Sequence, residues 1–418
     1  MRHVTVCAIL IALVAPLGAQ EKKPADGLTS KELKEAEGLL KQYFDAKSWD
    51  EKQKVAEQLA AIDHPSRSDI RTLATKCFLM GRRGPIIEGK TPQKCTHPDY
   101  PGSYIINGTS LARKGPVGLF ISLHGGGAGV GDGGQIAGLF GNPGQGMINV
   151  FPTVCQKTDT AWNTEREEQY VLAIIEELKR TYTIDTNRIF VAGHSMGGFG
   201  TWSIGGRHAD LFAAIAPMAG GVFAQVSNGN VTGLTGGVVF NLKNTPIWFY
   251  HSTDDAQVGS KSDEKAAEIL AKLKEKYGAY DFVWKLYTDC GHGLPKDGLK
   301  PIWDFMLAKR RDPLPKRVLW EPSRSYKKHF YWIRKTSTGG QVDVQRDGNK
   351  FTVTGSSSDI TIMLNEKMVK LDQPVVVVND KGEELFNGKV GYSLVAMAES
   401  IDAKKDPEMW FPAWVTLK

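Results

Sequence analysis

Residues 184–202 read IDTNRIFVAGHSMGGFGTW, and this stretch decides the fold. The run RIFVA at 188–192 is continuous and apolar, which is typical of a buried strand. Gly193-His194-Ser195-Met196-Gly197 follows at once and matches G-x-S-x-G, and a helical pattern starts just beyond the serine. A glycine-rich helix cap would give the same five letters. The strand before and the helix after favour a tight turn that presents a nucleophilic hydroxyl, so Ser195 is the predicted nucleophile.

The same alternation of strand and helix continues on both sides of this stretch. Apolar strand candidates are 118–123, 147–151, 213–217, 247–250 and 282–287, and amphipathic helix candidates are 165–182 and 263–277. Continuous apolar strands that alternate with helices predict an α/β fold, with a mostly parallel sheet covered by helices on both faces. We expect this catalytic domain to occupy residues 95–312.

The segments that flank this domain have a different character. Residues 28–80 carry apolar side chains every three or four positions and predict a helical N-terminal segment, followed by a Gly- and Pro-rich loop at 81–102. Beyond Asp312-Pro313-Leu314-Pro315 come short runs with period-two character: HFYWIR, QVDVQ, KFTVT, DITIML and PVVVV. They predict a small β-rich domain at 313–418, resembling a sandwich.

Composition narrows the class of protein. The chain has 418 residues with 41% hydrophobic and 23% charged side chains, enough to bury a large core in two or three domains. The net charge of +6 is mild and its basic residues are scattered, which argues against nucleic acid as a partner.

The first residues, MRHVTVCAILIALVAPLGAQ, join a basic start to an apolar stretch and end on Leu17-Gly18-Ala19. This form predicts a signal peptide at 1–19 and a secreted or periplasmic protein. The apolar stretch is too short to span a bilayer comfortably, and no integral membrane segment is expected in the mature chain.

A serine nucleophile needs a base and an acid, which in this architecture follow it in the order Ser, acid, His. The strand candidate at 247–250 leads into HSTDDAQV, where Asp254 and Asp255 compete for the role of the acid. The spacing H-x-x-x-D-x-x-V favours Asp255. His292 follows the last strand candidate and is the predicted base.

The transition state of acyl transfer also needs two N–H donors for its oxyanion. One is expected from Met196, directly after the nucleophile. The other is expected from His124-Gly125-Gly126-Gly127, with Gly126 as the preferred donor.

The cysteines suggest two further hypotheses, disulfide bonds and a zinc site. Cys77, Cys95, Cys155 and Cys290 remain after cleavage, and an even number in an oxidising compartment favours disulfides. Three pairings are possible; Cys77–Cys95 with Cys155–Cys290 is the preferred one. A zinc site built from Cys95-x-His97 and Cys290-x-His292 has the wrong spacing and would use up the predicted base, so no metal is expected.

A formal G-x-G-x-x-G at 129–134 lacks the context of a dinucleotide site, so no cofactor is expected either.

Residues 100–312 resemble the α/β-hydrolase superfamily, through LHGGG (123–127), the stretch 184–202, FAAIAPMAG (212–220), HSTDDAQV (251–258) and CGHG (290–293). The resemblance is closest to secreted esterases of the polyhydroxybutyrate-depolymerase, feruloyl-esterase and dienelactone-hydrolase-like groups and to prolyl-oligopeptidase catalytic domains. It implies the triad Ser195, Asp255 and His292.

The resemblance also implies an exported serine hydrolase acting on carboxylic esters, of small molecules or polymers. A serine peptidase of the prolyl-oligopeptidase type is the alternative among enzymes. A catalytically silent protein that binds a polymer or the cell envelope is the alternative from another class.

Overall fold

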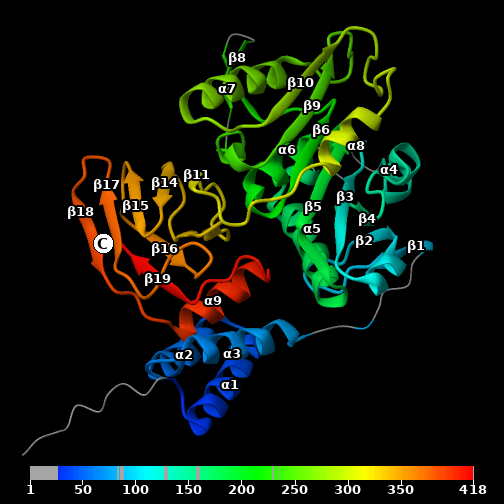
Figure 1. The fold of residues 1–418 in the computed structure, drawn as a ribbon. Coiled ribbons are helices and arrows are strands. Elements are labelled where there is room, and N and C mark those ends of the chain that lie inside the picture. The colour runs from blue at the N-terminus through cyan, green and yellow to red at the C-terminus, as the bar shows by residue number, and fades with distance from the viewer. Residues whose placement is uncertain are drawn as a thin grey trace, which may run out of the picture.

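The structure is a computed structural model that describes residues 27–81, 84, 89–126, 130–156, 161–227, 230–234 and 236–417 (Figure 1). The predicted signal peptide at 1–19 lies outside these residues. The N-terminal segment forms three helices: α1 (Ser30–Asp45), α2 (Trp49–Ala60) and α3 (Arg67–Leu79). Each begins at a capping box, with Thr29, Ser48 or Ser66 as the N-cap, because these hydroxyls accept hydrogen bonds from otherwise unpaired N–H groups of the first turn.

The centre of the molecule is an eight-stranded sheet in the order β1-β2-β4-β3-β5-β6-β9-β10. Its strands are β1 (Gly89–Lys94), β2 (Ser103–Asn107), β3 (Val117–Leu123), β4 (Ile148–Thr153), β5 (Ile184–His194), β6 (Ala214–Met218), β9 (Ile247–Ser252) and β10 (Phe282–Tyr287). All pairs from β4 to β10 are parallel, so the predicted mostly parallel sheet is confirmed. The edge strands β1 and β2 pair antiparallel, and the loop expected at 81–102 is therefore wrong where it includes β1.

Helices cover both faces of this sheet (Figure 1). Buried side chains of α5 (Glu165–Thr181), α6 (Met196–Arg207) and α7 (Lys261–Tyr277) belong to the apolar cluster on one face. Those of α4 (Gly133–Phe140) and α8 (Lys300–Leu307) belong to the cluster on the other. Successive residues of a strand serve opposite clusters, as Leu119 and Phe120 of β3 do, because side chains alternate along a strand.

Shorter elements complete this part of the chain. In chain order, a hairpin of β7 (Ala224–Ser227) and β8 (Asn230–Leu234) is inserted between β6 and β9. The 3-10 helices are η1 (Thr109–Lys114), η2 (Ala161–Asn163), η3 (Ala209–Leu211) and η4 (Phe240–Asn244).

The C-terminal part contains two smaller sheets, as its β-rich pattern predicted. One has the order β11-β14-β15-β17-β18 and the other β12-β13-β16-β19. Their strands are β11 (Arg317–Trp320), β12 (His329–Phe330), β13 (Ile333–Lys335), β14 (Val342–Asp347), β15 (Lys350–Thr354), β16 (Ile360–Leu364), β17 (Val375–Asn379), β18 (Glu384–Gly388) and β19 (Ala413–Thr416). The rings of Trp320 and Phe330 stack 5.6 Å apart and connect the two sheets.

Two expectations about this part were wrong. The run HFYWIR is not one strand, because the chain turns at Tyr331, whose φ is 47°, and β12 pairs antiparallel with β13. Helix α9 (Leu394–Lys404) was not expected at all. It packs against the N-terminal helices through a shared apolar cluster that joins Leu394, Met397 and Ile401 to buried residues of α1, α2 and α3 (Figure 1).

Buried ion pairs fasten the C-terminal part to the central sheet. Arg311 and Asp406 are both fully buried and lie 2.7 Å apart. Asp210, from η3, accepts hydrogen bonds from Lys327 at 2.8 Å and from Lys404 at 2.6 Å. Breaking such a pair on one side leaves an uncompensated buried charge, so these contacts resist separation of the two parts.

The cysteines do not form the predicted disulfides. No disulfide occurs among the described residues, and burial raises the pKa of the Cys77 and Cys155 thiols to about 12. Cys77 lies in the cluster of the N-terminal helices, whereas Cys95 belongs to the core of the sheet. The preferred pairing Cys77–Cys95 with Cys155–Cys290 is therefore wrong: it followed from an even number of cysteines, which says nothing about distance.

Candidate active site

Ser195 occupies a strained turn between β5 and α6. Its φ of 59° and ψ of −122° lie outside the regions that non-glycine residues normally adopt, and such strain is typical of functional sites. The glycines on either side are required by close approach. A Cβ on Gly193 would lie 2.3 Å from the Gly197 carbonyl oxygen, and a Cβ on Gly197 would lie 2.0 Å from that of Leu123. The motif G-x-S-x-G thus follows from the packing of this turn.

The structure brings His292 and Asp255 to this serine. His292 Nε2 lies 2.8 Å from Ser195 Oγ, and His292 Nδ1 lies 2.7 Å from Asp255 Oδ2. Asp255 follows β9 and His292 follows β10, so parallel neighbouring strands deliver both residues to the same edge of the sheet. The Asp255 side chain is fully buried, while 13% of His292 remains exposed.

Hydrogen bonds hold Asp255 as an anion. Burial alone would raise the pKa of this carboxyl, but the bonds from His292 and from the backbone of Val258 and Gln257 lower it below its ordinary value. The two backbone N–H groups donate to Oδ1 at 2.9 and 2.8 Å. Oδ2 is thereby left for the imidazole.

Asp254, the competing carboxylate, faces a different partner. Its Oδ1 accepts a hydrogen bond from the Ser252 hydroxyl and another, of 2.9 Å, from the backbone N–H of Gly291. Asp254 therefore anchors the loop that carries His292 and does not contact the imidazole in any described hydrogen bond.

The two predicted oxyanion donors lie on either side of the serine. Met196 is the first residue of α6, where a backbone N–H has no acceptor within its own helix. The loop after β3 approaches from the other side, because a Cβ on Gly125 would lie 3.1 Å from Ser195 Cβ. Gly126 follows with a φ of 86°, a conformation that favours glycine. Gly127 lies outside the described residues.

His124 fixes the orientation of this loop, a role that the motif alone did not reveal. Its ring is fully buried; Nε2 accepts from the backbone N–H of Val154 at 3.2 Å, so Nδ1 is the protonated nitrogen and donates to the Gly125 carbonyl at 2.8 Å. The N–H and C=O of a trans peptide point in opposite directions, so the Gly126 N–H points away from the imidazole.

Comparison with known proteins agrees with this geometry. Residues 157–228 match the family model of the prolyl oligopeptidase family. Over 113 residues the chain is 31% identical to the bifunctional acetylxylan esterase/xylanase XynS20E of Neocallimastix patriciarum; the match covers 27% of this chain and 15% of the length of that relative. The parallel sheet, the strained turn at Ser195 and the contacts of Ser195, His292 and Asp255 fit the expected α/β-hydrolase fold and a serine hydrolase.

Solved structures similar to this chain include two esterases. One is a thermostable esterase, 23% identical, with a TM-score of 0.41 over 53% of this chain and 63% of the other. Another is a phospholipase/carboxylesterase from Dyadobacter fermentans, 20% identical, with a TM-score of 0.38 over 53% of this chain and 100% of the other.

One further histidine lies beside His292. The ring of His194 is centred 5.2 Å from that of His292. Burial, together with the nearby His292, lowers the pKa of His194 to about 4, so its ring is neutral at neutral pH. Two protonated rings in contact would repel, and a neutral His194 leaves His292 free to accept a proton.

No group of three His, Cys, Asp or Glu side chains suited to a metal ion occurs in the part of the chain that the structure describes. The two Cys-x-His pairs that the zinc hypothesis would combine make other contacts. His292 bonds to Ser195 and Asp255, and the Cys95 N–H donates to the Gly102 carbonyl. Across the described ranges, no helix combines the length and apolarity needed to cross a bilayer.

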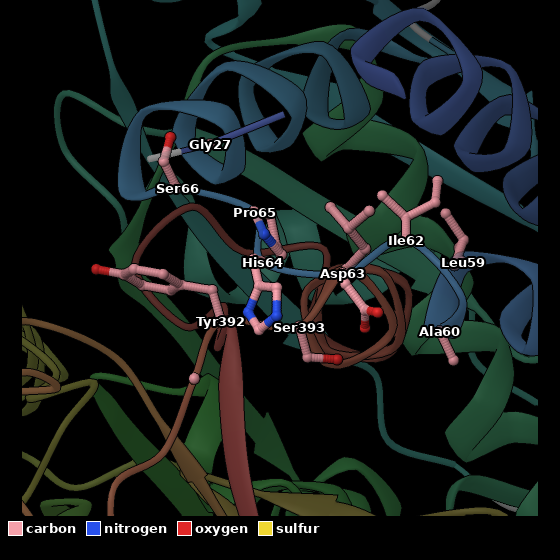
Figure 2. A pocket seen from close by; sticks show the side chains of 12 residues that line it. Gly27, Leu59, Ala60, Ile62, Asp63, His64, Pro65, Ser66, Tyr392 and Ser393 are labelled. Atoms are coloured by element: carbon pink, nitrogen blue, oxygen red, sulfur yellow. The ribbon is translucent and has the colours of Figure 1, made fainter. Parts of the chain in front are cut away.

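A cavity of about 550 Å³ lies elsewhere, between the α2–α3 connection and the start of α9 (Figure 2). His64, Asp63 and Tyr392 are among its lining residues, and no member of the triad is.

Proposed function

We propose that this protein is an exported serine hydrolase that cleaves carboxylic esters through an acyl-enzyme on Ser195. The observation that carries the proposal is the unbroken hydrogen-bonded chain from Ser195 Oγ through His292 to Asp255, with distances of 2.8 and 2.7 Å. A serine hydroxyl becomes a useful nucleophile only when a base is in position to take its proton.

The proposed reaction has two halves. Ser195 Oγ attacks the ester carbonyl carbon while its proton moves to His292 Nε2, and Asp255 stabilises the imidazolium that forms. The N–H groups of Met196 and Gly126 hold the oxyanion. The C–O bond to the alcohol then breaks, and the alcohol leaves with the proton from His292. Water, activated by the same imidazole, attacks the acyl-enzyme and releases the carboxylic acid and Ser195.

The preference for esters rests on the relative with acetylxylan esterase in its name, to which this chain is 31% identical over 113 residues. The match to the prolyl oligopeptidase family keeps peptidase activity as the second candidate. A silent binding protein has little need for a buried carboxylate aligned on an imidazole.

A substrate panel separates these candidates. It contains p-nitrophenyl acetate, acetylated xylan, methyl ferulate, a hydroxyalkanoate ester and a prolyl peptide anilide. We expect turnover of at least one ester, labelling by a fluorophosphonate, and loss of both in Ser195→Ala. Ser356→Ala, at an exposed serine remote from the turn, is the control. Turnover confined to the anilide would reject the esterase, and an unaffected Ser195→Ala would reject the mechanism.

Export is tested separately. The predicted signal peptide at 1–19 implies that the mature protein begins at Gln20. Intact mass and N-terminal sequencing of the protein recovered from the periplasm or medium should find this start; a chain that retains Met1 in the cell interior would contradict it.

A further inference from the structure

A second histidine–carboxylate pair lies directly behind Asp255. His251 is on β9 and Asp263 is on α7, and their side chains are 0% and 1% exposed. His251 Nδ1 lies 2.8 Å from Asp263 Oδ2. On the other side of the ring, Nε2 lies 2.9 Å from the Val258 carbonyl oxygen and 3.2 Å from Oδ2 of Asp255, the same oxygen that faces His292.

The partners of this ring determine its protonation. Both ring nitrogens of His251 face only acceptors: the carboxylates of Asp263 and Asp255 and a backbone carbonyl. A neutral imidazole carries one N–H, so it would leave one of these contacts without a hydrogen. Two N–H donors satisfy all of them. The second oxygen of Asp263 is satisfied as well, because Trp202 Nε1 donates to Oδ1 at 2.9 Å.

These contacts form a closed circuit that links α6, α7 and β9 and returns to the nucleophile. Trp202 lies on α6, the helix that starts directly after Ser195. From Trp202 the contacts run through Asp263 on α7 and His251 on β9 to Asp255, and from there through His292 back to Ser195. A displacement of Asp255 would therefore have to disturb α6 and α7 as well.

We propose that His251 and Asp263 are positioning residues for the triad: a permanently protonated His251, held by Asp263, fixes the Asp255 carboxylate and keeps it charged. This inference rests on the proposed role of Asp255 in ester hydrolysis. It gives His251 a part in catalysis beyond the hydrogen bonds that hold its ring at the end of β9.

The charges around His251 support this assignment. Burial would lower the pKa of His251, but the hydrogen bond to Asp263 and the charges of Asp263 and Asp255 raise it above its ordinary value. Glu264, the neighbour of Asp263 on α7, also interacts with the charge of His251. On the far side of Asp255 stands His292, whose Nδ1 contacts the same Oδ2 that faces His251.

Removing the positive charge of His251 should change the pH dependence of catalysis. His251→Gln removes the positive charge that faces Asp255 Oδ2 at 3.2 Å, so the electrostatic potential at the triad becomes more negative. The acid limb of the kcat/KM profile should therefore move to higher pH, by about half a unit to one unit. Asp263→Asn removes the carboxylate that holds His251 Nδ1 at 2.8 Å and should lower kcat as well.

The test combines kinetics with a readout that does not depend on activity. We expect kcat on p-nitrophenyl acetate to fall about 10-fold to 100-fold in His251→Gln, as for residues that orient a reactive group, with less change in KM. The control is His208→Gln. His208 is another buried histidine, at the C-terminal end of α6, and its Nε2 lies 2.8 Å from Glu168 Oε1. This variant should leave the acid limb where it is.

In the intact protein, ¹⁵N-histidine NMR at pH 8 should show one doubly protonated ring, and this signal should be absent from His251→Gln. A neutral His251 at pH 7, or a folded variant whose acid limb and kcat match those of the wild type, would overturn the inference. Should His251→Gln not fold, Asp263→Asn and the wild-type spectrum decide the matter. A wild-type protein without ester turnover would instead refute the proposed function.

Discussion

Replacing Asp255 by asparagine should abolish activity, whereas the same change at the adjacent Asp254 should not. In Asp255→Asn the oxygen of the amide is held at the Oδ1 position, because the N–H groups of Gln257 and Val258 both donate there. The amide NH₂ must then occupy the Oδ2 position, 2.7 Å from His292 Nδ1. An NH₂ group can only donate, so His292 must present the lone pair of Nδ1 and keep its proton on Nε2.

The magnitude follows from this change of tautomer. A proton on Nε2 faces Ser195 Oγ at 2.8 Å, and the imidazole can no longer accept the proton of the hydroxyl. A wrong tautomer of this kind costs about 10⁴-fold in kcat in a serine hydrolase. At about 1.4 kcal/mol for each factor of ten, the barrier rises by about 5 kcal/mol.

Asp254→Asn is the matched control. Its oxygen can still accept from Ser252 and from the Gly291 N–H, so the loop carrying His292 stays anchored. We expect a loss of less than about 10-fold, corresponding to part of one exposed hydrogen bond. The assay is kcat/KM on the best ester from pH 5 to 9, with melting temperature as a check on folding. Equal losses in both variants, or a larger loss at Asp254, would refute the assignment of Asp255.

Three further predictions concern the scaffold. Gly197→Ala places a Cβ 2.0 Å from the Leu123 carbonyl oxygen and should lower the free energy of unfolding by about 1–3 kcal/mol or more. Gly138→Ala in α4, with open space around it, should be neutral or stabilising. Chemical denaturation of both variants compares their free energies of unfolding. Arg311→Met leaves Asp406 buried without its partner and should cost about 3–5 kcal/mol in urea unfolding; an unchanged midpoint would contradict the role of this pair. Burial would raise the pKa of Glu168, but His208 and Arg207 lower it to about 2. A carboxyl with a lowered folded-state pKa stabilises the fold above its ordinary value of 4.5 and loses that contribution as the pH falls towards 2. Glu168→Gln should therefore flatten the melting temperature against pH in this window, and an equally steep decline would count against it.

The parts of the fold that the sequence predicts are those determined by local pattern. The strand before Ser195, its glycines and the helix after it follow from close packing of one short stretch, and chain order placed Asp255 and His292 beyond the next strands. Strand β1 has the sequence GKTPQK, which shows no apolar pattern. Only its pairing with β2 makes it a strand, and that pairing is not visible in the local sequence.

Other elements depend on contacts that no local pattern records. The run HFYWIR is apolar throughout and shows no sign of the turn at Tyr331. Helix α9 is buried by helices that lie hundreds of residues away. The contact of His251 with Asp263 likewise exists only once α7 packs beside β9, so the sequence could place His251 at the end of a strand but not assign its partner.

The packing of α9 against α1, α2 and α3 has a consequence for the order in which the protein is made. The helices up to Leu79 leave the ribosome long before Leu394 does, a delay on the order of 15–60 s at ordinary rates of synthesis. Throughout that time α9 is not present to bury the apolar face of these helices. The ion pairs of Asp210 with Lys404 and of Arg311 with Asp406 cannot form either. Nascent chains should therefore remain open to chaperones and proteases until α9 emerges, and its arrival completes helices that were translated first.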